Sequence, residues 1–404
     1  MISFGPTEEQ KLMQRTAEQF ARMLLRPNLR EFERARGVPE GIRKHACDLG
    51  LALAAIPDAL GGAGLGLTTA VLLEEEVAWG DPAVAFGFAG PGAMGLALAE
   101  LATAEQAKTL LLPFAANDAH SRFGAVAWGE RTTPEAREGL RTIATKGGTE
   151  FRLDGEKSYV INGDRADVFV VFAQVDASKG WDGIGAFAVK KGTPGLTVTP
   201  RKTTLGLDVA SFGGLTLDGV KVAETARLTG TEDVVSAAIR FFAKQALVMA
   251  SRGVGLSRAA FETTREYCDT RKAFGKPIGH FQAVAFTLAD RAMDVEAARA
   301  LVWRAAWAWD AGIDVREALK RTAYAVSFAH EAAMRCGDDA VQLHGGSGFI
   351  RDYPVEKFMR DSKQLQLCAM TAEQADQLAA AIELERPIDP ALVLPSPTSQ
   401  NTFV

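Results

Sequence analysis

Apolar residues recur every three or four positions over the first quarter of the chain, and this spacing predicts helices. The first predicted helix starts at Thr7, which makes a capping-box pattern with Gln10, and runs to about residue 36. A second helix starts at Pro39, because proline fits the first turn of a helix. Further helices are predicted over residues 67–79, 82–101 and 104–114. Residues 1–120 are therefore predicted to form an N-terminal helical domain.

The pattern changes to a period of two and to β-branched runs between Phe123 and Ala223. Asp154-Gly155 predicts a hairpin turn, because a tight primed turn needs positive φ. Turns fall at short intervals, which favours a small sandwich or barrel over a parallel α/β sheet. We expect a middle β domain over residues 121–230, with strands at residues 151–153, 157–160, 168–175, 185–189, 196–199 and 215–222.

A helical period returns from Thr231 onward and predicts a four-helix bundle over residues 231–386. One long helix carries an apolar stripe, and two more long helices cover about 282–310 and 315–336. A shorter helix follows, and residues 387–404 form a Pro- and Ser-rich tail. The fold class is therefore α+β. We expect three large side chains of the bundle to pack in its core: Met293, Trp303 and Trp307.

Composition excludes several classes of function. The chain has 404 residues, 47% of them hydrophobic, which is enough to bury a large core. A net charge of −5 without a long basic run argues against nucleic-acid binding. No apolar stretch reaches the length of a membrane span and the first ten residues are acidic, so we expect no membrane partner and a cytoplasmic location. Four scattered cysteines and five histidines without ligand spacing indicate neither disulfides nor a metal site.

The first chemical signal is the junction from Cys268 to Gln282 between two predicted helices. Arg271 lies there close to Phe274 and Gly275. A guanidinium binds phosphate oxygens through two parallel hydrogen bonds, so this junction suits a pyrophosphate. A capped helix–helix connection with a surface arginine is equally compatible.

The loop 61–66 matches GxGxxG only loosely, and we do not assign a dinucleotide to it because no strand precedes it and no acidic residue follows at the required distance.

A second signal follows the third long helix, at Gln342-Leu-His-Gly-Gly346. Gly345, Gly346 and Gly348 allow a backbone to approach a ligand closely, and the Gln342 amide offers both a donor and an acceptor. A glycine C-cap between two helices is the alternative interpretation.

These two segments together resemble the signature of the acyl-CoA dehydrogenase family. Arg271-Lys-Ala-Phe-Gly275 and Gln342-Leu-His-Gly-Gly346 carry the resemblance, together with Asp352, Pro354, Glu356, Arg360 and Asp361. The order of helical, β and bundle domains is similar too. The resemblance implies an FAD shared between the subunits of a homo- or hetero-oligomer, a dimer or a tetramer. It implies that FAD is held by Arg271, Phe274, Gln282, Gln342, Gly345, Gly346 and Thr371.

The resemblance also implies dehydrogenation of an acyl-CoA thioester, with a glutamate as the base for the α-proton. Here the sequence departs from the family. Ala369 stands at the usual glutamate position, and Gln245 stands at the position that some members use instead. Ala246 and Ala243 replace an arginine and an aspartate that contact substrate. The flavin-facing Trp-Ile-Thr reads 159-Tyr-Val-Ile-161, and the family's Thr-Glu-Pro run is only faintly visible over residues 128–134.

The motifs for the ADP part of FAD are therefore retained, whereas the residues that face the flavin and the substrate are changed. Four hypotheses follow from this contrast. The chain is a subunit whose partner carries the catalytic glutamate, or it is a self-sufficient dehydrogenase with another carboxylate, for which Glu373 and Glu130 are weak candidates. A flavin-dependent oxygenase or another flavoprotein on the same scaffold needs no such base. The fourth hypothesis is a scaffold without flavin. The acyl group and the electron acceptor stay open.

Overall fold

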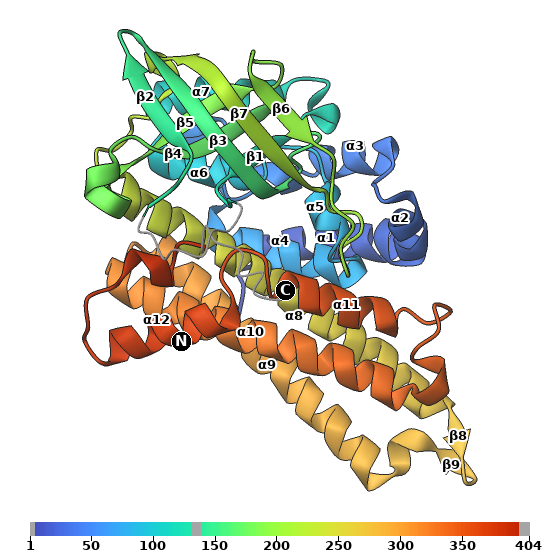
Figure 1. The fold of residues 1–404 in the computed structure, drawn as a ribbon. Helices are drawn as coiled ribbons and strands as arrows, with labels where there is room; N and C mark the ends of the chain where they lie inside the picture. Colours follow the sequence, from blue (N-terminus) through green and yellow to red (C-terminus); the bar gives the residue numbers. More distant parts are fainter. Residues whose placement is uncertain (1–4, 131–138, 396–404) are drawn as a thin grey trace, which may run out of the picture.

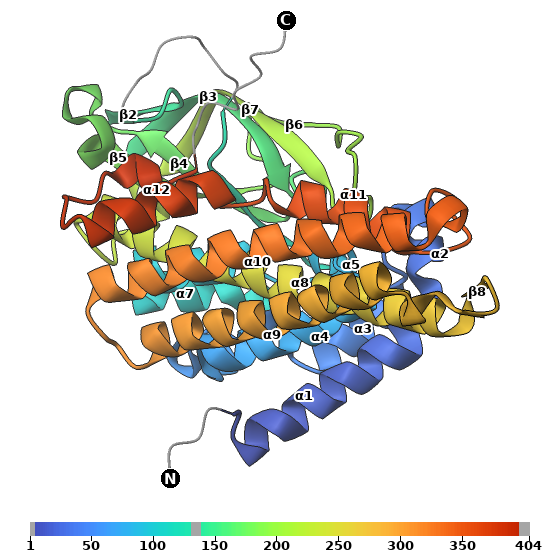
Figure 2. The same cartoon turned by 90° about the horizontal axis from the view of Figure 1, so that it is seen from below.

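A computed structural model describes residues 5–130 and 139–395 of the chain. Figure 1 shows a β-sheet lying on one side of a large helical body, with the long helix α8 (Val234–Thr270) between the sheet and the outer helices α9 (Gln282–Asp310) and α10 (Val315–Leu343). The shorter helices α11 (Val355–Leu365) and α12 (Ala372–Glu383) lie one after the other along α10 (Figure 2).

The N-terminal region is helical, as predicted, but its helices are shorter. The capping box of Thr7 and Gln10 starts α1 (Glu8–Phe20), and the predicted run to residue 36 is broken by a 3₁₀ turn that contains Pro27. The predicted helix 82–101 is wrong as a single helix. Gly90 has φ +135° and pairs with Phe123, which splits this segment. The other helices are α2 (Leu29–Ala35), α3 (Glu40–Asp48), α4 (Gly66–Gly80), α5 (Val84–Gly87), α6 (Ala93–Leu101) and α7 (Ala104–Leu111).

The middle region is a seven-stranded, mainly antiparallel sheet. Its order is β1-β4-β2-β3-β7-β6, with β5 paired to β4, and β1 runs parallel to β4. β4 is buried along its whole length, whereas β3 starts with alternating exposed and buried residues, as the period-two pattern predicted. The strands are β1 (Gly124–Ala127), β2 (Ile143–Gly147), β3 (Glu150–Ile161), β4 (Val168–Gln174), β5 (Ile184–Lys190), β6 (Leu196–Thr199) and β7 (Phe212–Ala223).

The hairpin predicted at Asp154-Gly155 is wrong. These residues lie inside β3, where the pairing with β7 shifts register between Leu153 and Gly155. Gly155 has φ +149°, and a Cβ there would lie 2.7 Å from Thr142. Glycine therefore marks a bulge here rather than a turn. The tight turn joins β2 to β3 at Gly148, which has φ +66°.

The bundle is built around α8, whose apolar stripe is buried as predicted. Gly255 of this helix packs against α4, because a Cβ there would lie 2.2 Å from the carbonyl oxygen of Glu75. No apolar stretch as long as a membrane span was predicted from the sequence, but α8 is long and apolar enough to cross a membrane. Because 72% of its apolar window is buried inside the protein, this is weak evidence for a span. The expected core packing is wrong for Met293 and Trp307, which are 62% and 53% exposed. Trp303 is partly buried against the core, as predicted.

A buried ion triad joins the bundle to the other two regions. The Lys357 ammonium on α11 donates to Asp81 after α4 at 2.9 Å and to Asp361 at 2.5 Å. Asp361 also accepts the backbone N–H of Leu207, in the segment between β6 and β7, at 2.6 Å. All three charged side chains are 1% exposed or less. The motif residue Asp361 therefore holds the three regions together.

Candidate functional site

The junction after α8 forms an exposed hairpin at one end of the bundle. Two-residue strands β8 (Lys272–Ala273) and β9 (Lys276–Pro277) project beyond the helices in Figure 1. Phe274 at the tip is 96% exposed and has φ +52°, followed by Gly275 with φ +82°. The Arg271 guanidinium is exposed, and within residues 5–130 and 139–395 it has no hydrogen-bonding or ionic partner. An unpaired cation beside an exposed aromatic ring is open to an anionic ligand.

The end of α10 lies beside this hairpin. Tyr267, near the end of α8, stacks on His344 with ring centroids 4.1 Å apart, and its hydroxyl donates to the His344 carbonyl at 3.3 Å. Gly345 has φ +56°, and a Cβ on Gly345 or Gly346 would meet no atom within 4 Å. The Gln342 side chain is also exposed. The open backbone and the free amide fit a ligand that approaches from outside this chain.

Six of the seven residues assigned to FAD thus lie at one end of the bundle, and the seventh does not. Gln282, the first residue of α9, is exposed at the same end. Thr371 caps α12, and its hydroxyl accepts the Gln374 backbone N–H at 3.2 Å. Figure 2 shows α12 far from β8. A ligand that contacted both groups would therefore have to lie between two copies or two different chains.

A small cavity of about 100 Å³ lies between α4, α6 and α8. Its wall is mostly apolar and includes small side chains such as Ala70 and Ala93. Gln245, one of the two residues that the resemblance places at a base position, lines it. Glu74 and Arg252 are the charged residues on its wall. Sequence reasoning missed both, since their pairing joins residues 178 positions apart.

Neither position that the resemblance assigns to the base carries a carboxylate, and at one of them, Ala369, the backbone has an unusual shape. Ala369 is half-buried against the core and has φ +62°, which is rare for a residue with a Cβ. Tyr159, at the position of the family's flavin-facing tryptophan, also has positive φ (+55°) and is 49% exposed. Such strain persists only where the surrounding structure imposes it. Residues 131–134 of the faint Thr-Glu-Pro run lie outside the described residues.

The two weak base candidates are committed elsewhere. Glu130 is 4% exposed and accepts the Lys157 ammonium at 2.8 Å and the backbone N–H groups of Arg141 and Thr142. Burial opposes ionisation, but Lys157 and these N–H groups lower its pKa overall. Glu373 is exposed in the first turn of α12, where backbone and Thr371 hydrogen bonds lower its pKa. Neither side chain lines the cavity beside Gln245.

A buried histidine lies under the usual base position. His330 of α10 is 0% exposed, and among the described residues neither ring nitrogen has a hydrogen-bond partner; the backbone of Met370 and the carboxylate of Glu373 lie near the ring. Burial lowers the pKa of His330 to about 4, so the imidazole is neutral at pH 7. No sequence pattern indicated that this residue is buried.

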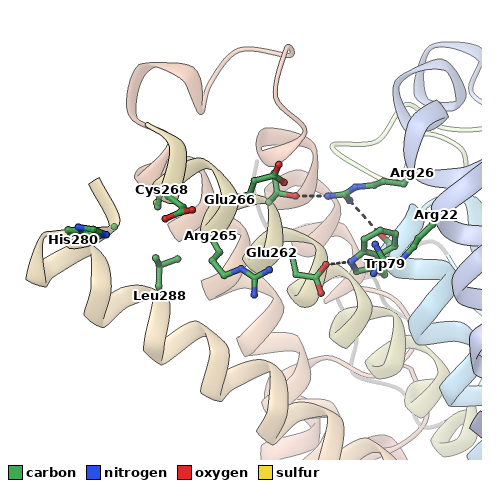
Figure 3. Close-up of a pocket in the computed structure, with 12 residues that line it drawn as sticks. Arg22, Arg26, Trp79, Glu262, Arg265, Glu266, Cys268, His280 and Leu288 are labelled. Atoms are coloured by element: carbon green, nitrogen blue, oxygen red, sulfur yellow. Dashed lines mark hydrogen bonds between the residues drawn. The ribbon is translucent and has the colours of Figure 1, made fainter. Parts of the chain in front are cut away.

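A larger cleft of about 840 Å³ opens near the same end of the bundle as the hairpin. Figure 3 shows Arg26 and Trp79 on one wall and Cys268 with His280 on the other. Its wall carries three arginines and three carboxylates. The Trp79 indole donates to Glu262 at 2.8 Å, and burial lowers the pKa of Arg26 to about 10. The balanced walls give this cleft no preference for one class of ligand. Among the described residues, no group of three His, Cys, Asp or Glu could hold a metal ion.

Comparison with known proteins gives consistent matches along the chain. The models of the N-terminal, middle and C-terminal domains of acyl-CoA dehydrogenases match residues 7–118, 125–220 and 235–380. The chain is 33% identical over 368 residues to an acyl-CoA dehydrogenase of Bacillus subtilis, covering 91% of this chain and 96% of the relative. It is 30% identical over 374 residues to the benzylmalonyl-CoA dehydrogenase of Aromatoleum aromaticum, covering 92% and 97%.

A solved structure shares the whole fold. The butyryl-CoA dehydrogenase of Megasphaera elsdenii superposes on this chain with a TM-score of 0.86 at 30% identity. The match covers 95% of this chain and 100% of the other.

Proposed function

The chain belongs to the acyl-CoA dehydrogenase family, and we propose that it serves the FAD-dependent α,β-dehydrogenation of an acyl-CoA thioester as a subunit of a hetero-oligomer. The observation that carries the proposal is the contrast between the two halves of the site. One end of the bundle offers free groups for FAD, whereas the cavity has Gln245 and no uncommitted carboxylate. In this arrangement a partner chain supplies the base, and this chain completes the cofactor site.

The residues at the bundle end fit the ADP half of FAD. Arg271 suits the pyrophosphate, because its planar guanidinium can bond two phosphate oxygens at once. Phe274 offers an apolar face, and the Gln342 amide can both donate and accept. When bound, FAD supplies the acceptor for the β-hydride. The groups of this chain bind and orient the cofactor from outside the partner's flavin pocket.

The cavity's own carboxylate does not replace the missing base. Both oxygens of Glu74 accept hydrogen bonds from Arg252, at 2.8 and 3.2 Å. A base must reach the substrate proton, and this pairing holds the carboxylate beside Arg252, which lies seven residues from Gln245 on α8, about 10 Å along the axis at roughly 1.5 Å per residue. The remaining polar residue near the reacting position is Gln245, whose amide cannot accept a proton at neutral pH.

The first test is the visible absorbance of the chain purified alone and after co-expression with a family chain that carries the glutamate. We expect little FAD in the isolated chain, and FAD that is bleached by an acyl-CoA in the complex. Arg271→Ala should lower the FAD content of the complex, whereas Lys272→Ala, an exposed neighbour, should not. A full complement of FAD that bleaches in the isolated chain would show a self-sufficient enzyme instead.

A second test restores the base. Gln245→Glu changes one amide to a carboxylate without changing the side-chain length. A positioned base contributes roughly 10²–10⁴-fold, so bleaching of the FAD-loaded chain by butyryl-CoA should accelerate by that order. Gln377→Glu adds the same charge on the exposed face of α12 and serves as the control. An unchanged rate despite thioester binding would remove Gln245 from the reacting position.

A further inference from the structure

The cavity beside Gln245 ends on a buried ion pair. Arg252, only 7% exposed, donates from Nε and Nη2 to the two oxygens of Glu74. Its guanidinium carbon lies 4.3 Å from the centre of the Phe86 ring, so the cation is held in place from a second side. The pair is therefore a fixed polar feature on an otherwise mostly apolar wall.

This pair leaves hydrogen-bonding capacity unused. Arginine has five N–H donors, and Glu74 takes only two of them. The contact of Nη1 is the Met249 sulfur at 4.0 Å, which is a weak acceptor. A purely hydrocarbon ligand against this wall would cover the charges without replacing their water contacts, which is unfavourable. The pair therefore favours a ligand with its own polar group.

The position of the pair fixes where that polar group would lie. Gln245 and Arg252 are seven residues apart on α8, hence on one face and about 10 Å apart along the axis at roughly 1.5 Å per residue. Gln245 marks the end of the cavity where the acyl α-carbon reacts. Arg252 marks the opposite end. A cavity of roughly 150 Å³ holds benzene, a ligand of six carbons. This cavity is smaller, about 100 Å³, so the acyl group is short.

We infer that this cavity selects a short acyl group with a hydroxyl at its distal end; the inference rests on the proposed function. The hydroxyl oxygen accepts a hydrogen bond from a spare N–H of Arg252, and the hydroxyl O–H donates a hydrogen bond to the Glu74 carboxylate. One hydroxyl matches both partners, since it is donor and acceptor at once. A distal carboxylate would instead be repelled by Glu74, and a distal methyl would leave both partners unsatisfied.

The test measures binding of four thioesters to the full-length chain by calorimetry, in its FAD-containing complex if the chain co-purifies with a partner. The probes are butyryl-CoA, 4-hydroxybutyryl-CoA, succinyl-CoA and hexanoyl-CoA. We expect 4-hydroxybutyryl-CoA to bind about tenfold more tightly or better than butyryl-CoA, the gain of a hydrogen bond to a charged group. Succinyl-CoA and hexanoyl-CoA should bind more weakly than the hydroxy compound.

Variants connect the preference to the pair. The double variant Arg252→Met with Glu74→Gln removes both charges together, which avoids a lone buried ion, and it should lose the tenfold preference. Arg240→Met on the same helix removes a cation that pairs with Glu100 at 2.7 Å outside the cavity, and it should keep the preference.

The outcomes separate this inference from the proposed function. Equal binding of butyryl-CoA and 4-hydroxybutyryl-CoA to the wild-type chain, or tighter binding of succinyl-CoA or hexanoyl-CoA, overturns the hydroxyl preference and leaves the proposed function standing. A preference that survives in the double variant overturns the role of the pair. Failure to bind any thioester overturns both the inference and the proposed function. The wild-type measurement alone decides the hydroxyl preference, whatever the folding of the variants.

Discussion

Replacing Lys357 with methionine should destabilise the fold more than most single substitutions. Lys357 is the only cation in contact with Asp81 and Asp361 among the described residues, and both carboxylates are at most 1% exposed. Burial opposes its charged form, yet Asp361 and Asp81 together raise the pKa of Lys357. Burial likewise raises the pKa of Asp361, so this carboxyl depends on the cation for its ionised form.

The magnitude follows from what the variant leaves behind. Lys357→Met removes one partner of a buried ion pair, and such changes cost about 3–5 kcal/mol because a charge stays buried without compensation. That is a large part of a typical total stability of about 5–15 kcal/mol. Asp361 would also hold the Leu207 N–H less firmly, so the contact between the bundle and the sheet region should loosen.

The assay is equilibrium unfolding in urea, monitored by tryptophan fluorescence. A shift of the unfolding midpoint reports a change in stability if the slope of the unfolding free energy against urea concentration is unchanged. The matched control is Lys357→Met combined with Asp81→Asn and Asp361→Asn. These asparagines can still accept the N–H groups of Ala83 and Leu207, so the triple variant should recover most of the loss. A loss below about 1 kcal/mol for Lys357→Met, or a triple variant as unstable as the single one, would refute this reasoning.

Three further predictions concern the surroundings of the site. The pKa of His330 in the folded protein is about 4, below its ordinary value of about 6.5, so its neutral form stabilises the fold above pH 6.5 and this stability is lost as pH falls to 4. Between pH 7 and 4.5 the wild type should therefore lose about 2–3 kcal/mol more unfolding free energy than His330→Gln. Equal losses in urea titrations of the two proteins would contradict this prediction. Phe274→Ala should reduce FAD retention in the assembled protein without changing its melting temperature, because the ring is 96% exposed in the single chain; a lowered melting temperature of the apoprotein would point to a structural role. Trp128→Phe should free the C-terminal segment, whose Pro395 carbonyl accepts the indole N–H at 2.7 Å, and faster proteolysis near residue 395 checks this, with an unchanged cleavage rate counting against it.

Local patterns were enough to predict most helices and strands. The helix predicted over residues 282–310 has these bounds in the structure, because turns flank it on both sides. The errors arose where tertiary contacts decide. Gly155 reads as a turn but lies at a bulge that faces Thr142. The exposure of Trp307 depends on which face of α9 meets its neighbours, and the apolar residues on both faces of α9 conceal that choice.

The candidate site divides in the same way. The segments around Arg271 and Gln342 were found because each motif is continuous in sequence. Their proximity depends on the stacking of Tyr267 on His344, and no local sequence pattern predicts that contact. The pair of Arg252 and Glu74 joins α8 to α4 across 178 residues and carries no motif. Charges on helices are common, so only the folded chain shows which of them line a cavity.

The backbone and the side chains of this site give different information about function. Tyr159, Phe274 and Ala369 all have positive φ, a shape that costs free energy for any residue with a Cβ. The surrounding fold imposes this shape whether or not the side chain is reactive, so Ala369 can hold the backbone of a base position without a base. A match to the fold therefore establishes the geometry, and the side chains at positions 245 and 369 determine whether this chain can take the proton itself. Because neither side chain can do so, we expect this chain to contribute to the shared FAD site that we propose rather than to the proton transfer.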